Sequence, residues 1–131
     1  MKSPSIVVLL ILLLATTWAL AAHDHLKTGN IGLLIIHQPL QVNGDSLPAG
    51  EYEVRHVTTS PSAHHLEFTR VTHVAQTDVD GPTTPYERQV AARVNCKIEV
   101  LDRIVSETSL QNEGSRVVKV EIKGENVAHS L

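Results

Sequence analysis

Apolar and polar residues alternate with a period of two along much of the chain after residue 30. The longest such run covers residues 90–100, with polar or small residues between the apolar ones. Its apolar positions are Val90, Ala92, Val94, Cys96, Ile98 and Val100. Alternation of this kind is typical of a β-strand with one buried and one solvated face. The pattern therefore predicts that Cys96 points into a hydrophobic core.

Shorter runs with β-strand character occur over residues 32–37, 51–57, 65–70, 108–110, 117–122 and 127–131. The segment from Gly32 to His37 is almost wholly apolar, which predicts a first strand buried on both faces. Turn-forming residues separate the runs, as at Asn43-Gly44 and Ser60-Pro61-Ser62. About seven short strands at this spacing predict an all-β fold, a single antiparallel β-sandwich or Greek-key barrel.

Two of these runs, Tyr52–Val57 and His65–Arg70, are expected to pair as an antiparallel hairpin. Two registers keep their apolar side chains on one face. One sets Glu53 opposite Glu67, which like-charge repulsion disfavours. The other sets Arg55 opposite Glu67 and places Val54 opposite Phe68. We predict the second register.

The first 21 residues have the order of a secretory signal peptide. Lys2 precedes an unbroken apolar run over residues 6–15, and Ala19 and Ala21 occupy the small-residue positions before a cleavage site. The run is about half the ~20 apolar residues that a membrane-spanning helix needs. We predict a signal peptide over residues 1–21, a flexible tail over 22–29 and a β-sandwich domain over 30–131. The protein is then secreted or periplasmic, with no membrane span after cleavage.

Composition narrows the classes of function. The formal net charge is −3, and removal of Lys2 with the signal peptide makes it one unit more negative. A mildly acidic domain without a basic run is poorly suited to nucleic acid, because such binding depends on Lys and Arg neutralising phosphates. The single cysteine, Cys96, cannot form an internal disulfide. Its place among apolar positions predicts a core residue rather than a reactive nucleophile.

One segment carries a resemblance. Residues 47–54 read Leu-Pro-Ala-Gly-Glu-Tyr-Glu-Val, and this L-P-x-G-x-Y-x-V sequence resembles the turn and strand of small secreted bacterial β proteins of unassigned function. It is more distantly similar to transthyretin-like and immunoglobulin-like sandwich modules. The resemblance implies the β-sandwich architecture and no chemistry. Pro48 and Gly50 also have a purely conformational explanation, since both favour a tight turn.

The eight histidines are the most unusual feature of the composition. His23 and His25 follow the predicted new N-terminus, where a free amine and imidazoles can chelate Cu(II) in a square-planar arrangement. We expect no resident cofactor. If a metal binds, His23 and His25 are the candidate ligands and copper is the candidate ion, and the alternative is a flexible polar tail without a ligand. The other histidines show no C-x-x-C or H-x-x-x-H spacing and are expected to be solvated or at strand edges. Asp78, Asp80 and Glu87 only partly match a calcium loop, because Pro82 and Pro85 interrupt it.

No motif of a nucleophilic or nucleotide-dependent enzyme occurs in the sequence. The sequence therefore predicts an exported, non-catalytic domain with a structural or protein-interaction role and an unknown protein partner. A metal-binding periplasmic protein that uses the His-rich N-terminus is the alternative. A hydrolase with an unrecognised site is the third hypothesis. The oligomeric state does not follow from the sequence.

Overall fold

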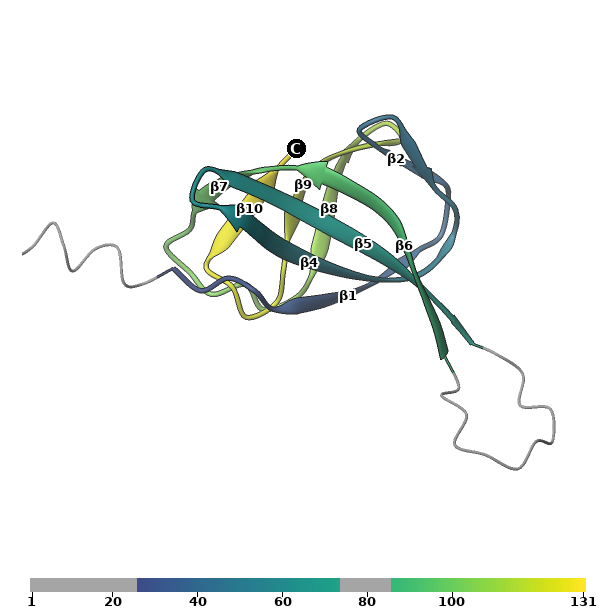
Figure 1. Cartoon of the computed structure of the whole chain (residues 1–131), viewed down its shortest axis with the longest axis horizontal. Coiled ribbons are helices and arrows are strands. Elements are labelled where there is room, and N and C mark those ends of the chain that lie inside the picture. Colours follow the sequence, from purple (N-terminus) through teal and green to yellow (C-terminus); the bar gives the residue numbers. More distant parts are fainter. Residues whose placement is uncertain (1–25, 74–85) are drawn as a thin grey trace, which may run out of the picture.

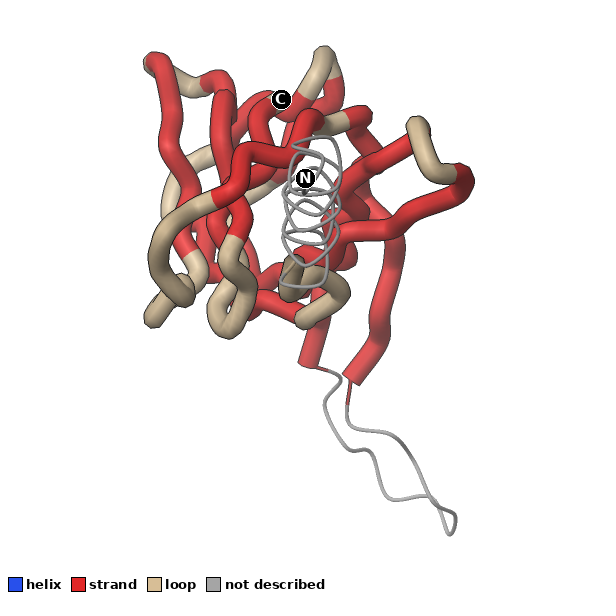
Figure 2. Tube along the Cα trace, turned by 90° about the vertical axis from the view of Figure 1, so that its left-hand side faces the viewer, coloured by secondary structure: helices blue, strands red, loops and turns tan. Residues whose placement is uncertain are grey.

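The computed structural model describes residues 26–73 and 86–131. Every regular element in these two ranges is a β-strand, and the strands form two sheets that pack against each other (Figures 1 and 2). The all-β sandwich expected from the alternation is confirmed. Within the described ranges there is no helix of the length and apolarity needed to cross a bilayer.

The first sheet contains β1 (Ile31–Ile36), β4 (Gly50–Ser60), β5 (Ala63–His73) and β6 (Tyr86–Asn95), in the order β1-β4-β5-β6. The second contains β2 (Leu40–Val42), β3 (Asp45–Leu47), β7 (Lys97–Val100), β9 (Arg116–Glu121) and β10 (Val127–Ser130), in the order β3-β2-β9-β10-β7. Strand β8 (Ser109–Glu113) pairs with β9. All of these pairings are antiparallel except the short contact between β2 and β9.

The core lies between the sheets and is built from the inward residues of each strand, as the period-two pattern requires. Its fully buried apolar side chains include Val42, Leu47, Val54, Leu66, Phe68, Val120, Ile122 and Val127. The strand predicted over residues 32–37 is present as β1, but the expected burial of both its faces was wrong. Strand β1 is buried on one face only, because it lies at the edge of the first sheet and Leu33 and Ile35 face away from the core.

The β4–β5 hairpin has the predicted register. Val54 lies opposite Phe68, and Arg55 lies opposite Glu67. Two guanidinium groups bind the Glu67 carboxylate from the outer face, with Arg55 at 2.8 Å and Arg93 at 2.9 Å. The predicted register is therefore confirmed.

The predicted strand over residues 90–100 is divided in two places. Opposite Phe68 and Thr69 the register shifts and Ala91 becomes the extra residue of a β-bulge, which turns Val90 to the outer face, where it is 42% exposed. At Cys96 the chain then leaves the first sheet and enters the second as β7. Cys96 N–H donates to the carbonyl of His64 at 3.1 Å and fixes this crossing.

Tyr52 anchors the L-P-x-G-x-Y-x-V segment in the core. Its ring is 1% exposed within the core, and its hydroxyl donates to the Pro48 carbonyl at 2.6 Å. This bond closes the turn that delivers the chain into β4. In this protein the segment therefore serves the packing of the sandwich.

Candidate metal centre

Three side chains with metal-binding atoms meet inside the sandwich. His56 comes from β4 in the first sheet, His129 comes from β10 in the second sheet, and Cys96 stands where the chain crosses between the sheets. One ligand atom from each of the three lies within 4.8 Å of the other two. His56 is 8% exposed and His129 is wholly buried, whereas Cys96 is partly buried. Convergence of imidazole and thiol groups in one buried place is the arrangement that thiophilic metal ions use.

A buried carboxylate orients the ring of His129. Glu125 is wholly buried and lies just before β10, with its Oε2 atom 2.7 Å from His129 Nε2. Its Oε1 atom accepts hydrogen bonds from the backbone N–H groups of Gly29, at 2.9 Å, and Asn30, at 3.2 Å. With Glu125 as the acceptor, Nε2 of His129 carries the hydrogen and Nδ1 keeps its lone pair. That lone pair faces Cys96, whose Sγ lies 3.9 Å away.

This carboxylate–histidine pair is the arrangement that metal-ligating histidines commonly have. The carboxylate fixes the tautomer and the ring orientation, and it increases the basicity of the other ring nitrogen. The backbone of the chain leading into β1 in turn holds Glu125, and Asn126 also accepts from the N–H of Lys27 at 2.7 Å. Within the described residues, the chain is thus already hydrogen-bonded to the domain at Lys27.

The environment keeps His56 neutral at physiological pH. Burial lowers its pKa, and the neighbouring His129 and His64 lower it further, against an opposing effect of the Glu125 charge. A neutral imidazole has a free lone pair, so no proton competes with a metal ion for this ligand. His56 and His129 also stack, with ring centroids 4.9 Å apart.

The pKa of Cys96 is shifted in the opposite direction to that of His56. Burial, together with the nearby Glu125 charge, raises its pKa to about 11. The thiol is therefore protonated near neutral pH and is a poor nucleophile, as the sequence predicted. A metal ion that binds the sulfur must displace this proton.

The histidines other than His23 and His25 were expected to be solvated or at strand edges. This expectation was wrong for His56 and His129. Both occupy inward positions of their strands, and His56 follows Tyr52 and Val54 in the buried alternation. This position in the alternation was the sequence feature that could have predicted the burial of His56. The expectation agrees with the structure at His37, which is exposed, and at His73, whose Nε2 lies 2.8 Å from Glu51 at the surface.

The ligands predicted from the N-terminal sequence, His23 and His25, lie outside the described residues, as do Asp78 and Asp80 of the calcium-like segment. The cluster of His56, Cys96 and His129 is thus a different candidate from the predicted one. It has no fixed short spacing, because its members are brought together by the packing of two sheets.

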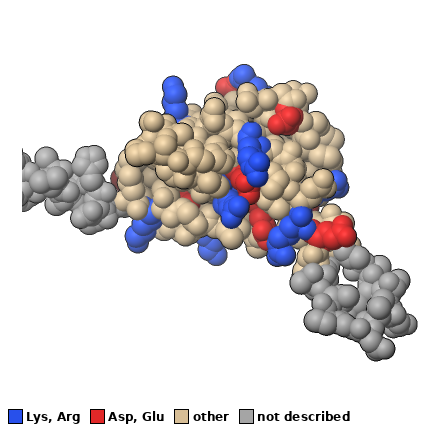
Figure 3. Space-filling model, in the orientation of Figure 1, with Lys and Arg blue, Asp and Glu red and all other residues tan. Residues whose placement is uncertain are grey.

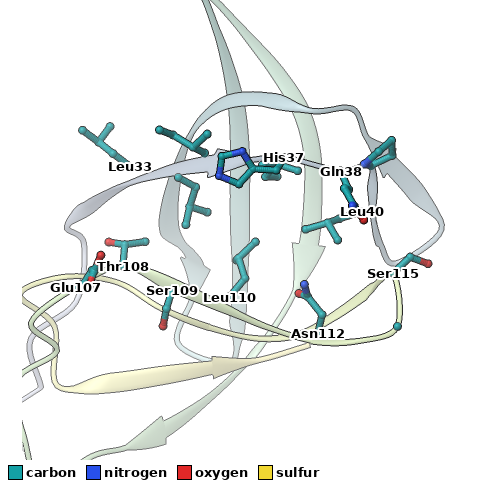
Figure 4. A pocket seen from close by; sticks show the side chains of 15 residues that line it. Leu33, His37, Gln38, Leu40, Glu107, Thr108, Ser109, Leu110, Asn112 and Ser115 are labelled. Carbon is teal, nitrogen blue, oxygen red and sulfur yellow. The ribbon is translucent and has the colours of Figure 1, made fainter.

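A wide groove lies elsewhere on the described surface, between the edge strands β1 and β8. It has a volume of about 710 Å³, with Leu33, His37 and Leu40 along one side and Thr108, Leu110 and Asn112 along the other (Figure 4). His37 and Glu107 are the titratable residues in its lining. The groove brings together no further catalytic group, so it offers space without reactive chemistry.

The outer face of the first sheet carries paired charges. Basic and acidic side chains alternate across this face (Figure 3). Glu67 binds both Arg55 and Arg93, and Arg88 lies 3.2 Å from Glu53. Because each cation has a nearby anion, this face has no single-sign patch of the kind that nucleic-acid binding requires.

Searches against protein-family models, curated proteins and solved structures found no match to this chain.

Proposed function

We propose that this protein is an exported, non-catalytic metal-binding domain, and that His56, Cys96 and His129 hold one divalent transition-metal ion. The observation that carries the proposal is the convergence of their ligand atoms within 4.8 Å, with a buried carboxylate orienting one of the imidazoles. A soft thiolate with two imidazoles is a ligand set for ions of the zinc and copper class.

Charge balance favours a divalent ion over a monovalent one. Glu125 and a metal-bound Cys96 thiolate together carry two negative charges in a site where His129 and Glu125 are wholly buried. A divalent cation neutralises both charges, whereas Cu(I) leaves one negative charge uncompensated. Uncompensated buried charge is costly. Zn²⁺ meets this condition and also suits the mixed nitrogen and sulfur ligands.

A hydrogen-bond chain without metal is the competing explanation. Every buried side-chain nitrogen and oxygen in the described residues has a partner, so Cys96, His129 and Glu125 form a satisfied chain by themselves. The two explanations differ in one measurable consequence. A metal centre binds an ion at low concentration with loss of the thiol proton, and a purely structural chain does not.

The test is calorimetric titration of the mature protein with Zn²⁺ at pH 7, alongside Cys96→Ser and a version that begins at Leu26. We expect one ion per chain, loss of this binding in Cys96→Ser and unchanged binding in the shortened version. Release of the Cys96 proton should weaken binding about tenfold for each unit of pH decrease near neutrality. Equal binding by wild type and Cys96→Ser would contradict the proposal. Loss of binding in the shortened version would instead assign the ion to His23 and His25.

A second function, protein interaction, is favoured by the outer face of β1. Ile31, Leu33 and Ile35 are 57%, 73% and 66% exposed on an edge strand that carries no charged residue. Natural edge strands commonly carry charges or Pro that prevent pairing with another chain. Because β1 lacks both, we propose that it pairs antiparallel with β1 of a second copy.

Light scattering after size-exclusion chromatography tests this pairing. We expect a dimer for the wild type and a monomer for Leu33→Lys, whose new charge faces the solvent and leaves the core unchanged. A monomeric wild type at high concentration would refute self-association.

A further inference from the structure

A fourth potential ligand, His64, lies beside the candidate metal centre on β5. Its Nδ1 is 3.1 Å from Nε2 of His56, and the two rings are stacked with centroids 5.1 Å apart. The β4–β5 register explains this proximity. Thr58 lies opposite His64 and His56 lies opposite Leu66, so the two histidines are diagonal neighbours on the inward face of the sheet.

The separation between the two imidazole nitrogens matches that of two ligands on one ion. Nitrogen atoms bound at ~2.0 Å with a tetrahedral angle lie ~3.3 Å apart, and a sulfur and a nitrogen lie ~3.5 Å apart. The structure has 3.1 Å between His56 and His64, and 3.9 Å between Cys96 and His129. Four donor atoms therefore stand as two pairs, each within about half an ångström of the tetrahedral spacing.

Surface access also reaches this side of the centre. A pocket of about 530 Å³ is lined by His64 and Cys96, together with Ala63, Asn95, Ser130 and Leu131. His64 and Cys96 are partly exposed, whereas His129 is wholly buried. A hydrated ion that enters this pocket meets His64 and Cys96 before it reaches the interior ligands.

We infer that His64 is the fourth ligand of a tetrahedral His₃Cys site, and that it closes the coordination sphere from the pocket side. The inference rests on the proposed metal-binding function. On binding, the hydrogen bond between His56 and His64 is lost. The hydrogen that it held moves to the other nitrogen of the donor ring, so that both facing nitrogens offer lone pairs to the ion. The product is a closed four-coordinate site for a divalent ion such as Zn²⁺, with no position left for water.

The test uses Co²⁺ as a spectroscopic substitute for Zn²⁺ in the mature protein, with His64→Ala and His65→Ala compared with the wild type. His65 is the matched control, because it is the adjacent histidine on β5 and its side chain points to the opposite face of the sheet. The wild type and His65→Ala should give the intense visible bands of a tetrahedral thiolate-bound Co²⁺ ion. His64→Ala should bind at least ~10-fold more weakly and show the weaker bands of a site that has gained water, which is the scale expected for removal of a coordinating partner.

The outcomes separate the two proposals. If the wild type binds neither Co²⁺ nor Zn²⁺, the metal-binding function fails and this inference fails with it. If the wild type binds and His64→Ala gives the same spectrum and affinity, the metal centre stands and only the fourth ligand is refuted. Circular dichroism of the metal-free variants establishes that they are folded, and His64→Asn replaces His64→Ala if the latter is not.

Discussion

Substitution of Glu125 tests its wholly buried hydrogen bond with His129. Glu125→Ala removes the acceptor of His129 Nε2–H, which is wholly buried and has no access to water. Leaving such a donor unsatisfied costs about 1–3 kcal/mol. The lost methylene groups leave a cavity that adds roughly 1–2 kcal/mol. The backbone N–H groups of Gly29 and Asn30 lose the same acceptor but lie near the surface, where water replaces it.

We therefore expect Glu125→Ala to lower the free energy of unfolding of the metal-free protein by about 3 kcal/mol, a value combined from these two costs. Glu125→Gln keeps the volume and one oxygen acceptor, so a loss of about 1 kcal/mol is expected. Its amide, however, presents N–H to His129 Nε2, which moves the ring hydrogen to Nδ1 and takes away the metal-facing lone pair. Metal affinity should then fall by about 10–100-fold in a stable protein.

Urea unfolding followed by circular dichroism gives the stabilities, and Zn²⁺ titration gives the affinities. Glu121→Gln is the matched control, because Glu121 pairs at the surface with the half-exposed Arg103 and should lose less than ~1 kcal/mol. A Glu125→Ala protein within about 0.5 kcal/mol of the wild type would refute the assigned burial of the His129 donor. Unchanged Zn²⁺ affinity in Glu125→Gln would refute its role in orienting His129.

Two further predictions concern the fold. Hydrogen bonds from Arg93 and Arg55 lower the pKa of Glu67 below its ordinary value, against the effect of burial. A lowered folded-state pKa contributes stability that is fully present above the unfolded value and is lost as pH falls through the folded value. The stability difference between wild type and Glu67→Gln should therefore be complete at pH 7, begin to decrease near pH 4.5 and be lost below the lowered pKa. Both arginines are more than half exposed, so the difference should be only about 1 kcal/mol, and its persistence at pH 2 would refute the assignment. Gly32→Ala would place a Cβ 2.6 Å from Thr108 Cγ2, so urea unfolding should show a loss of about 1–3 kcal/mol that Thr108→Ala partly restores. No restoration in the double variant would refute the contact.

Alternation along the chain predicted the inward face of β4 and β5 well, because one-sided burial imposes a strict period of two. It failed at Val90 and Val100. A bulge reverses the side-chain direction at Val90, and the crossing at Cys96 begins a new strand that leaves Val100 68% exposed. The hydrophobic pattern carries no mark of either event. An edge position likewise exposes one face of β1, and sheet order is not a local property of the sequence.

The candidate metal centre could not be found by a search for fixed spacings of ligand residues. His56, Cys96 and His129 come from distant parts of the chain, and only the packing of the two sheets brings them together. The alternation of apolar positions could have predicted that His56 and Cys96 point toward the core. It could not show that Glu125, in a turn before β10, reaches back to the N–H groups of Gly29 and Asn30.

The placement of the ligands on both sheets has a mechanical consequence. An ion held by His56 of the first sheet, His129 of the second and Cys96 at the crossing would cross-link the two sheets. Exported domains often resist unfolding through disulfides, which a chain with one cysteine cannot form internally. Here the ion would serve as a reversible cross-link whose strength depends on supply. At a free concentration 100-fold above its dissociation constant it would add about 2.7 kcal/mol against separation of the sheets. The stability of the proposed exported protein would then depend on the metal content of its surroundings.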